Sequence, residues 1–402
     1  MGAGHAGLAT SHCLAEHGIE HVVLERGRVA ERWRSERWDS LTLLTPNWAT
    51  WLPGYTYTGD EPDGYMGRDE VAGYLDAYAA AFDPPLRTGV DVRGVTRHDG
   101  GYRLRTSDGE LEVAAVVLAT GPFQLPRVPA LAAGLPDDVT QVHSSAYRNA
   151  TQLPPGGVLV VGGGASGQQI AEDLLRAGRA VHLSVGRLRA VPRRYRGRDY
   201  FWWLENTGFY DATVDTLAGG RPPKMPSPSL TGVNGGHDLS ARTLAAQGAT
   251  VVGRLAAVDG GRLLFADDLA GSLARGDEAF ARFVERVEGW LADHGEQADA
   301  PEHRPALPDP PAASDGQFQV DLVTAGIASI IWATGFQPSF EWVHVPILDD
   351  RGAPVHHRGI TASRGLYVLG LPWLHRQRSA FIRGAEEDAR HIAAHLATVL
   401  SA

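Results

Sequence analysis

Two short glycine motifs offer the clearest chemistry in this sequence. They are Gly2-Ala3-Gly4-His5-Ala6-Gly7 and Gly162-Gly163-Gly164-Ala165-Ser166-Gly167. Both fit G-x-G-x-x-G, in which the first glycine makes a tight turn after a strand, the second lets a pyrophosphate approach the backbone, and the third lets the next helix pack closely. The helix N-terminus then offers N–H groups to the phosphates. We therefore expect two dinucleotide sites and electron transfer between their ligands, with the binding residues Gly2, Gly4 and Gly7 in one and Gly162, Gly164, Ser166 and Gly167 in the other.

The residues downstream of the two motifs favour different ligands. A strand is predicted over residues 21–24, and Glu25 follows it, with Arg26 next in the chain. An acid at this position binds ribose hydroxyls and favours FAD or NAD. The equivalent part of the second copy has no carboxylate, but it has Arg187 and a run of further arginines that includes Arg193. Guanidinium groups pair with the 2′-phosphate of NADPH, so we expect FAD at the first site and NADPH at the second. A solvated loop is the alternative explanation of the arginine run.

One expected element is missing from the sequence. The apolar strand Val158-Leu159-Val160-Val161 precedes the second motif, but only Met1 precedes the first. This strand is central in a doubly wound sheet, and without it backbone groups and apolar helix faces would be left exposed. Either the start is assigned too late or the chain is truncated, and we favour the first explanation because the rest of the FAD half is intact. A chain that begins at Met1 is expected to bind FAD weakly or not at all.

Composition limits the class of protein. The 402 residues are 43% hydrophobic and 21% charged, as is typical of a soluble globular protein with two or three domains. The sequence has neither a run of about 18 apolar residues nor a signal-peptide pattern, so no membrane span is expected. The net charge of −10 argues against nucleic acid as a partner. The single cysteine, Cys13, indicates a reducing cytoplasm and excludes the cysteine pair that a disulfide reductase needs. No metal site is predicted.

The order of elements predicts an α/β protein in which one Rossmann-like domain is nested inside another. Residues 1–150 are the first part of a discontinuous FAD domain, 151–325 the NADPH domain, and 326–402 the return segment of the FAD domain. Two buried strands end in the same Ala-Thr-Gly turn, which fits the two chain crossings. The turns are Ala119-Thr120-Gly121, whose Thr120 and Gly121 we assign to the FAD site, and Ala333-Thr334-Gly335. Helices are predicted over about 279–294 and 379–400.

With these features in place, the chain resembles the class B flavoprotein monooxygenases, which include flavin-containing, YUCCA-like and Baeyer–Villiger enzymes. The likeness spans nearly the whole chain, because both glycine motifs, both Ala-Thr-Gly turns and the terminal strand and helix occur in the expected order. The resemblance implies an FAD enzyme that is reduced by NADPH, captures O2 as a flavin C4a-(hydro)peroxide, and inserts one oxygen atom into a small organic substrate. N-, S- and Baeyer–Villiger-type oxygenation, the substrate and the oligomeric state are left open.

The resemblance also implies roles for residues outside the glycine motifs. His143 and Tyr147 match the second half of the linker signature F-x-G-x-x-x-H-x-x-x-(W/Y), which implies a hinge between the domains, but Asp137 and Val139 stand where the first half has Phe and Gly. On the residues alone, His143 is equally a hydrogen-bonded hinge histidine with no part in domain coupling.

Three more positions are implied to lie beside the flavin. Asn47, in the segment Leu44-Thr45-Pro46-Asn47-Trp48, resembles an asparagine that orients the reacting groups, and it is the one candidate catalytic residue. An Asx turn after Pro46 is the alternative. Trp33 resembles a tryptophan beside the isoalloxazine, and Gly370 stands near the expected ribityl and pyrophosphate groups.

Two other functions remain open at this point. The protein could pass electrons from NAD(P)H through FAD to a quinone, a partner protein or O2 without oxygenation. Alternatively, a truncated chain could bind nucleotides without catalysis. An oxygen-18 label in an organic product would separate the monooxygenase from the first of these.

Overall fold

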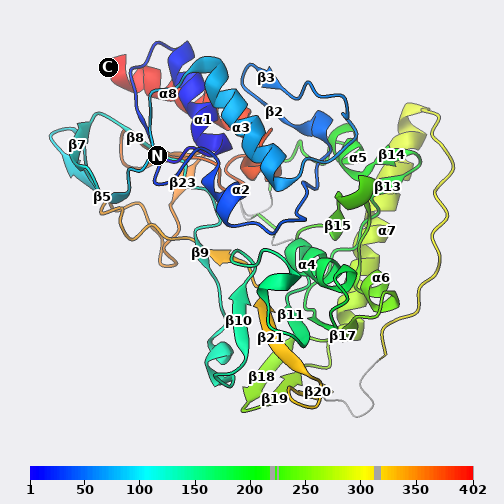
Figure 1. Cartoon of the computed structure of the whole chain (residues 1–402). Coiled ribbons are helices and arrows are strands. Elements are labelled where there is room, and N and C mark those ends of the chain that lie inside the picture. Colours follow the sequence, from blue (N-terminus) through cyan, green and yellow to red (C-terminus); the bar gives the residue numbers. More distant parts are fainter. Residues whose placement is uncertain (218–221, 224–225, 312–317, 402) are drawn as a thin grey trace.

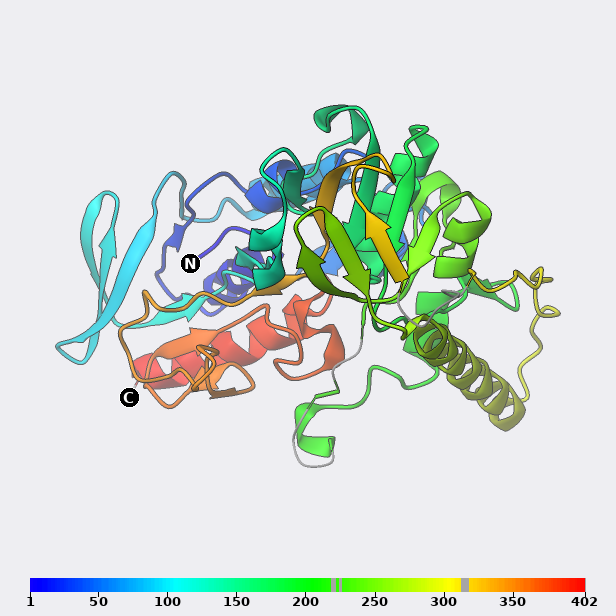
Figure 2. The same ribbon diagram turned by 90° about the horizontal axis from the view of Figure 1, so that it is seen from below.

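The computed structural model describes residues 1–217, 222–223, 226–311 and 318–401. The chain forms two α/β units that are joined by two crossings (Figure 1). The first unit contains the chain from α1 to β8 and again from β23 to α8. The second unit contains the chain from β10 to β21. Seen from below, the sheet of the second unit and the long helix α7 lie to one side of the first unit (Figure 2).

The second unit is built on a parallel sheet with the strand order β10-β21-β11-β12-β17. All five residues of the central strand β11 are buried, which is why it reads as a continuous apolar run. Its strands and helices are β10 (Thr140–His143), β11 (Gly157–Val161), α4 (Ala165–Arg176), β12 (Val181–Ser184), β13 (Arg194–Tyr195), β14 (Arg198–Asp199), α5 (Tyr200–Asn206), β15 (Leu230–Thr231), β16 (His237–Asp238), α6 (Ala241–Ala246), β17 (Thr250–Val252), β18 (Leu255–Asp259), β19 (Arg262–Phe265), α7 (Leu269–His294), β20 (Phe318–Asp321) and β21 (Ile327–Trp332).

This sheet extends beyond the predicted second domain. The predicted range 151–325 leaves out β10 and β21, which pair with each other and supply two of the five strands. The chain therefore enters the sheet before residue 151 and leaves it after residue 325. The crossings lie between these strands and the first unit. There, β9 (Leu125–Pro126) pairs antiparallel with β22 (Phe336–Gln337), next to the two predicted Ala-Thr-Gly turns.

The first unit has the same type of fold, but its strands form separate sheets. β1 pairs only with β4 among the described strands, and β8 ends a second sheet of order β23-β24-β25-β8. Its elements are α1 (His5–Glu16), β1 (Val23–Leu24), α2 (Glu31–Ser35), β2 (Trp51–Leu52), β3 (Tyr55–Thr56), α3 (Arg68–Phe82), β4 (Leu86–Arg87), β5 (Val92–His98), β6 (Gly101–Thr106), β7 (Gly109–Val113), β8 (Val116–Leu118), β23 (His356–His357), β24 (Ile360–Thr361), β25 (Leu366–Val368) and α8 (Ala385–Ser401).

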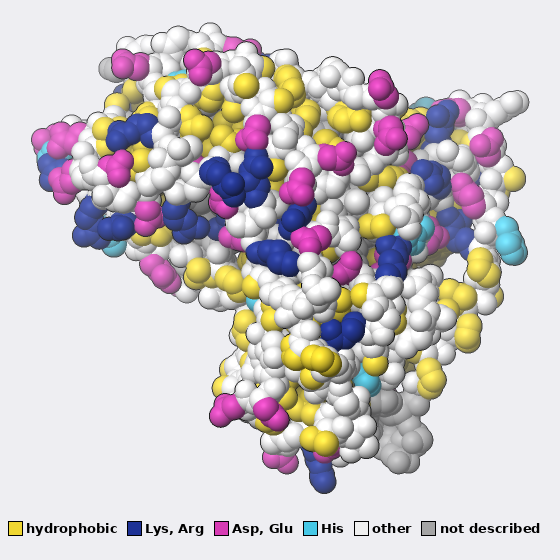
Figure 3. All heavy atoms as spheres, viewed as in Figure 1, with side chains coloured by type: hydrophobic (Ala, Val, Ile, Leu, Met, Phe, Trp, Pro, Cys, Tyr) yellow, Lys and Arg dark blue, Asp and Glu magenta, His cyan; other side chains and the backbone are white. Residues whose placement is uncertain are grey.

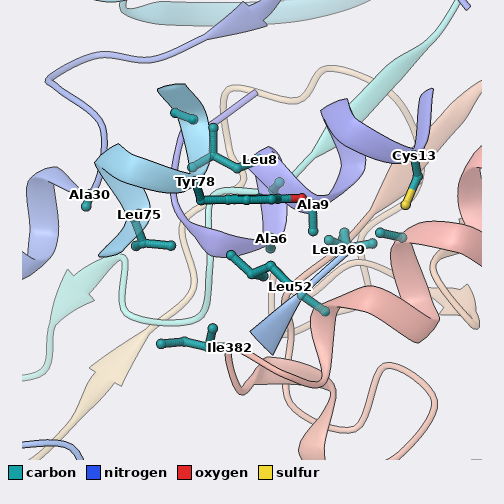
Figure 4. Packing of buried hydrophobic residues seen from close by; sticks show 14 of the residues in the cluster. Ala6, Leu8, Ala9, Cys13, Ala30, Leu52, Leu75, Tyr78, Leu369 and Ile382 are labelled. Atoms are coloured by element: carbon teal, nitrogen blue, oxygen red, sulfur yellow. The ribbon is translucent and has the colours of Figure 1, made fainter. Parts of the chain in front are cut away.

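A buried core holds the helices of the first unit together. Helix α1 packs against both α3 and α8. Leu8 and Cys13 from α1 meet Leu75 and Tyr78 from α3 and Leu369 from the segment after β25 (Figure 4). This packing positions the N-terminus of α1, which lies within the first glycine motif. The predicted fold class, two nested Rossmann-like domains with the first one discontinuous, is confirmed.

Only Met1 and Gly2 stand between β1 and β8. The Met1 ammonium donates to Val117 O (2.8 Å), and Ala119 N–H donates to Met1 O (2.9 Å). On the other side, Gly2 N–H donates to Leu24 O (2.8 Å). No other strand separates β1 from β8 within the described chain.

Two helices begin at different residues from those predicted. Helix α7 ends at His294 as expected but begins at Leu269, ten residues earlier than the predicted start near residue 279. The C-terminal helix begins at Ala385, not near Ser379. Residues 377–380 instead form a 3-10 turn, and the chain folds back so tightly that a Cβ on Gly384 would lie 1.8 Å from Arg378 O.

Two properties of the structure concern a membrane and nucleic acid, the partners that the sequence argued against. None of the described helices is long and apolar enough to cross a membrane. On the face shown in Figure 3, Lys and Arg side chains are interspersed with Asp and Glu, and hydrophobic side chains lie between them. The described part of this face is therefore not the uniformly basic surface that binds nucleic-acid phosphates.

Candidate dinucleotide-binding sites

The two glycine loops are closed by the same hydrogen bonds. In each unit, the N–H of the first glycine donates to the carbonyl oxygen at the end of the next strand. The N–H of the alanine in the Ala-Thr-Gly turn donates to the carbonyl oxygen of the residue just before that glycine. In the first unit these bonds are Gly2 N to Leu24 O (2.8 Å) and Ala119 N to Met1 O (2.9 Å), and in the second they are Gly162 N to Ser184 O (2.9 Å) and Ala333 N to Val161 O (2.9 Å). Met1 thus occupies in the first unit the place of Val161 in the second.

The outer two glycines of each motif cannot carry a side chain. Gly2 and Gly162 have positive φ angles of +98° and +135°, a region that L side chains rarely adopt. A Cβ on Gly7 would lie 1.8 Å from Gly2 O, and a Cβ on Gly167 would lie 1.9 Å from Gly162 O. The third glycine is therefore needed for the helix to pack against the turn.

The middle glycine of each motif faces open space. A Cβ built on Gly4 or Gly164 meets no atom within 4 Å. Both residues are helix N-caps, at α1 and α4, and neither helix has an acidic residue in its first turn or a side chain that caps it. The N–H groups at both helix starts are thus available to an anion, and Ser166 is exposed in the first turn of α4. Both loops fit the pyrophosphate of a dinucleotide.

Glu25 is fixed beside the first loop. Its carboxylate accepts hydrogen bonds from Ala3 N–H (2.7 Å) and Gly27 N–H (2.7 Å), and the side chain is half-buried. Arg26 next to it is exposed. Val185, which follows β12 as Glu25 follows β1, is fully buried and offers no polar group. Only the first site therefore has an acid in the position for ribose hydroxyls.

The two arginines predicted to bind NADPH have different surroundings. Arg187 is exposed and makes no hydrogen bond or ion pair with the described residues. Arg193 is only 2% exposed, donates to Leu44 O (2.8 Å) and pairs with Asp199 (2.8 Å). Its guanidinium also lies 4.8 Å from the ring centre of Tyr65. Arg193 therefore holds the two units together, and in this structure it is not free to meet a phosphate, whereas Arg187 is.

Three predicted FAD residues lie after strands of the first unit. Thr120 and Gly121 follow β8, and Gly370 follows β25. Ligands of open α/β sheets bind at this carboxyl edge of the strands. Gly121 and Gly370 have positive φ angles of +71° and +76°, and a Cβ on Gly370 would lie 2.8 Å from Ala6 Cβ. Gly370 thus lets the end of β25 approach α1 closely.

Trp33 lies where the first unit meets the crossing segment. It is half-buried, and the Arg37 guanidinium lies 5.4 Å from its ring centre and 5.5 Å from that of Phe123. Burial lowers the pKa of Arg37 to about 10, so the guanidinium stays charged at neutral pH. Phe123 is 48% exposed and precedes β9. This aromatic and cationic group is compatible with a wall beside a flavin, which remains a prediction.

The two predicted hinge residues lie close to the crossings. His143, at the end of β10, donates from Nε2–H to Gly335 O (2.9 Å), and burial lowers its pKa. Tyr147 is fully buried and its hydroxyl donates to Asp173 (2.7 Å). Asp173 also accepts from the Ser40 hydroxyl of the first unit (2.6 Å). His143 thus contacts a crossing directly and Tyr147 reaches the first unit through Asp173, while a role of either residue in domain motion remains a prediction.

Asn47 is already engaged by the backbone. The side chain is 4% exposed, its Nδ2 donates to Glu61 O (2.9 Å), and its Oδ1 accepts from Met66 N–H (2.9 Å). It therefore fixes the loop between residues 61 and 66 and does not form the Asx turn considered from the sequence. Its position near the flavin remains a prediction.

Arg383, just before α8, is a candidate that the sequence did not indicate. It is 3% exposed, forms an ion pair with Glu205 of α5, and lies 5.3 Å from the ring centre of Trp51 and 5.1 Å from that of Tyr210. Its Nε and Nη1 have no hydrogen-bond partner in the part of the chain that the structure describes. Burial lowers its pKa to about 10. A buried cation with free donors suits an anionic group, but a single arginine before a helix has no sequence pattern to mark it.

Comparisons with known proteins agree with this geometry. The family model described as pyridine nucleotide-disulphide oxidoreductase matches residues 1–199. An uncharacterized CzcO-like oxidoreductase of Geobacillus kaustophilus is 34% identical over 98% of this chain and 95% of its own length. The indole-3-pyruvate monooxygenase YUCCA1 of Oryza sativa is 34% identical over half of each chain. The flavin-containing monooxygenase from Stenotrophomonas maltophilia shares the fold, with a TM-score of 0.68 and 19% identity over 100% of this chain and 97% of that one.

Proposed function

The chain belongs to the family of the CzcO-like oxidoreductases, and from that premise we propose that it is an FAD- and NADPH-dependent monooxygenase. It is an oxidoreductase, and the resemblance to the class B flavoprotein monooxygenases is confirmed at the level of family and fold. The proposed reaction inserts one oxygen atom from O2 into a small organic substrate. When bound, NADPH would supply the reducing equivalents and FAD the centre that activates oxygen.

One observation carries the assignment of the two cofactors. Two loops of the same geometry present free helix N-termini, but only the first has an acid beside it. In the proposal, Glu25 receives the ribose hydroxyls of FAD while Ala3 N–H and Gly27 N–H hold its carboxylate in place. At the second loop, the exposed guanidinium of Arg187 pairs with the 2′-phosphate of NADPH, because Val185 offers no competing carboxylate.

The positioning residues around the crossings complete the proposal. In the proposal, Trp33 and Arg37 form a wall beside the flavin, and His143 anchors one crossing to the second sheet. Arg383 offers free N–H donors to an anionic part of the cofactor or substrate. Asn47, held through both ends of its amide, keeps the loop at residues 61–66 in place, and the proposal puts its side chain near the flavin.

Electron transfer without oxygenation is the second candidate function. It uses the same two cofactor sites, so their geometry supports it equally. Reduction of a disulfide through a cysteine pair is not part of it, because Cys13 is the single cysteine of the sequence. Cys13 is also buried, and burial raises its thiol pKa to about 12.

An isotope experiment separates the two candidates. The protein is loaded with FAD, its flavin content is measured, and NADPH oxidation is followed under 18O2 with a panel of amines, sulfides and ketones. We expect one labelled oxygen atom in an organic product for each NADPH consumed, and free FAD serves as the blank. Peroxide equal to the NADPH consumed, with unlabelled organic compounds, would replace the monooxygenase with the electron-transfer function.

A further inference from the structure

The buried Arg383 is one end of a longer chain of arginine and aromatic side chains. Its guanidinium lies 5.3 Å from the ring centre of Trp51 and 5.1 Å from that of Tyr210. The Tyr210 ring packs edge-on against Phe209, with ring centres 5.4 Å apart. We call Arg383, Trp51 and Tyr210 the inner group, and the chain of side chains continues from it through Phe209.

Two further arginines lie beside Phe209. The guanidinium of Arg189 is 5.8 Å from the Phe209 ring centre, and that of Arg286 is 5.3 Å from it. Arg189 donates to the Tyr200 hydroxyl (2.8 Å), whereas Arg286, on α7, is exposed and makes no hydrogen bond or ion pair with the described residues. We call Arg189, Phe209 and Arg286 the outer group. Neither of its cations is neutralised by a carboxylate in the described chain.

The outer group lies beside the second glycine loop. Arg189 O accepts from Ser229 N–H (3.0 Å), and the Ser229 hydroxyl accepts from the Gln168 amide (2.7 Å). The same amide nitrogen donates to Gly163 O of the second motif (2.7 Å). The outer group is thus linked through two residues to the loop proposed to hold NADPH.

The inner group lies beside the first glycine loop. Leu52 and Ile382, the chain neighbours of Trp51 and Arg383, belong to the same buried core as Ala6 of the first motif (Figure 4). The inner group is therefore next to the loop proposed to hold FAD. A substrate has to come close to the flavin in order to react, so a binding group in this place is well situated for one.

Positive charge exceeds negative charge along these groups. Glu205 pairs with both Arg378 (3.3 Å) and Arg383, and Glu387 pairs with Arg376 (3.0 Å). Among the described residues, these two carboxylates are the only ones that pair with any of Arg189, Arg286, Arg376, Arg378 and Arg383. Such an excess is unusual in a protein of net charge −10. Burying a cation without a counter-ion is costly, so an anion from outside the chain would stabilise this arrangement.

The inner group combines two kinds of contact that an organic anion can use together. Arg383 is 3% exposed, and its Nε and Nη1 have no hydrogen-bond partner in the described chain. Guanidinium N–H groups form charge-assisted hydrogen bonds with carboxylates. The rings of Trp51 and Tyr210 offer apolar faces beside those donors. A carboxylate attached to an apolar body would use both the charge and the rings, whereas an inorganic anion would use only the charge.

We propose that the inner and outer groups form the substrate site, and that the substrate is a small organic acid with an aromatic or apolar body. Its carboxylate would bind Arg383, and its body would pack on Trp51 and Tyr210 beside the flavin. The two cations of the outer group would attract the acid towards the inner group. The inference rests on the proposed function, because it names the substrate class of that reaction.

The first test measures binding without turnover. The full chain, with and without saturating FAD, is titrated with hydrocinnamate and with hydrocinnamide, which has the same body but no charge, and ligand-observed NMR gives the dissociation constants. We expect the acid to bind at least about tenfold more tightly than the amide, because only the acid makes charge-assisted bonds. Equal constants for the two compounds would overturn the proposal.

Three variants then assign the effect to residues. Arg383→Gln should weaken binding of the acid at least about tenfold and leave the amide unchanged. Arg286→Gln should weaken the acid by about threefold at low salt and less at high salt, because its charge is exposed. Arg282→Gln is the matched control, since Arg282 lies four residues earlier on α7 and pairs with Glu278 (3.4 Å), and it should change neither compound.

The outcomes that contradict the proposal are distinct. A folded Arg383→Gln variant that binds the acid at full affinity would overturn it. If Arg383→Gln does not fold, equal effects of Arg286→Gln and Arg282→Gln would overturn it, and a loss confined to Arg286→Gln would support it.

Two other sources of the anion are separated by the same variants. If Arg383→Gln weakened FAD binding and not that of the acid, the arginine would belong to the flavin site, and the proposal would be wrong. It would also be wrong if Arg286→Gln weakened NADPH binding and not that of the acid. An acid that binds but gains no labelled oxygen would overturn only the proposed oxygenation. Oxygenation of ketones or amines without any binding of the acid would overturn only the present inference.

Discussion

The two glycine loops have the same local geometry, although the strands behind them differ. In the second unit, β11 supports its loop and is bonded on both edges by β12 and β21. In the first unit, only Met1 and Gly2 of the described residues stand between β1 and β8, yet Gly2, Gly4 and Gly7 adopt the same arrangement. The loop is thus shaped by contacts within itself and with the Ala-Thr-Gly turn, whereas the strand behind it makes a separate contribution to the stability of the sheet.

A second difference concerns the residue after the next strand. Glu25 closes the first loop by accepting from Ala3 N–H, while buried Val185 holds the equivalent place in the second unit. The two units therefore share the phosphate-binding part and differ in the part that would distinguish the adenosine ribose. The comparison predicts that substitutions in the loops have matched effects in both units, and that substitutions at the ribose positions do not.

The largest expected effect comes from the residue that joins the units. Arg193→Ala would leave Asp199 without its ion-pair partner at the interface and would remove the bond to Leu44 O. Breaking a buried ion pair costs about 3–5 kcal/mol in the free energy of unfolding. Thermal and denaturant unfolding measure this loss. A variant of unchanged stability that no longer prefers NADPH would instead place Arg193 at the 2′-phosphate.

Arg187→Ala is the matched control for this substitution. Arg187 is exposed and unpaired among the described residues, so its loss should change stability by less than about 0.5 kcal/mol. The preference for NADPH over NADH should fall by about 1.5–3 kcal/mol, the contribution of a charge-assisted hydrogen bond, and the ratio of kcat/KM values measures it. Equal ratios in the wild type and the variant would move the phosphate away from Arg187.

The next largest effect comes from the third glycine of each loop. Gly7→Ala and Gly167→Ala would place Cβ atoms 1.8 Å and 1.9 Å from backbone oxygens, so the helix must shift. We expect a loss of about 3 kcal/mol in each case, together with loss of the dinucleotide in the altered unit only. Isothermal titration with each nucleotide measures the two sites separately. If either variant retained its own nucleotide at full affinity, the loops would not be the phosphate sites.

The sequence predicted the local parts of this structure better than the distant contacts. The glycine loops, Glu25, the Ala-Thr-Gly turns and the missing strand depend on short segments or on a repeat of one pattern, so they could be found without coordinates. The burial of Arg193 depends on Leu44 and Tyr65, which lie far away in the chain. Asn47 likewise bonds to residues 61 and 66, and Arg383 meets Trp51 and two residues near 205–210, both far from it in the chain. No local pattern encodes these partners.

A small effect on stability is expected at the middle glycines. Gly4→Ala and Gly164→Ala add a methyl group where no protein atom lies within 4 Å, at φ angles of −82° and −78° that alanine readily adopts. The free energy of unfolding should change by less than about 1 kcal/mol, because the lower entropy of the unfolded chain and the poorer N-cap oppose each other.

Ligand binding should respond to the same two substitutions far more than stability does. The methyl group would occupy the space through which a pyrophosphate reaches the backbone, so each variant should lose at least about tenfold in affinity for its own nucleotide. Gly4→Ala should affect FAD and leave NADPH binding unchanged, and Gly164→Ala should do the reverse. A Gly164→Ala variant with an unchanged NADPH dissociation constant would mean that the open space at the second loop is not where the pyrophosphate lies. The two units would then share the backbone geometry of their loops but not the position of the ligand.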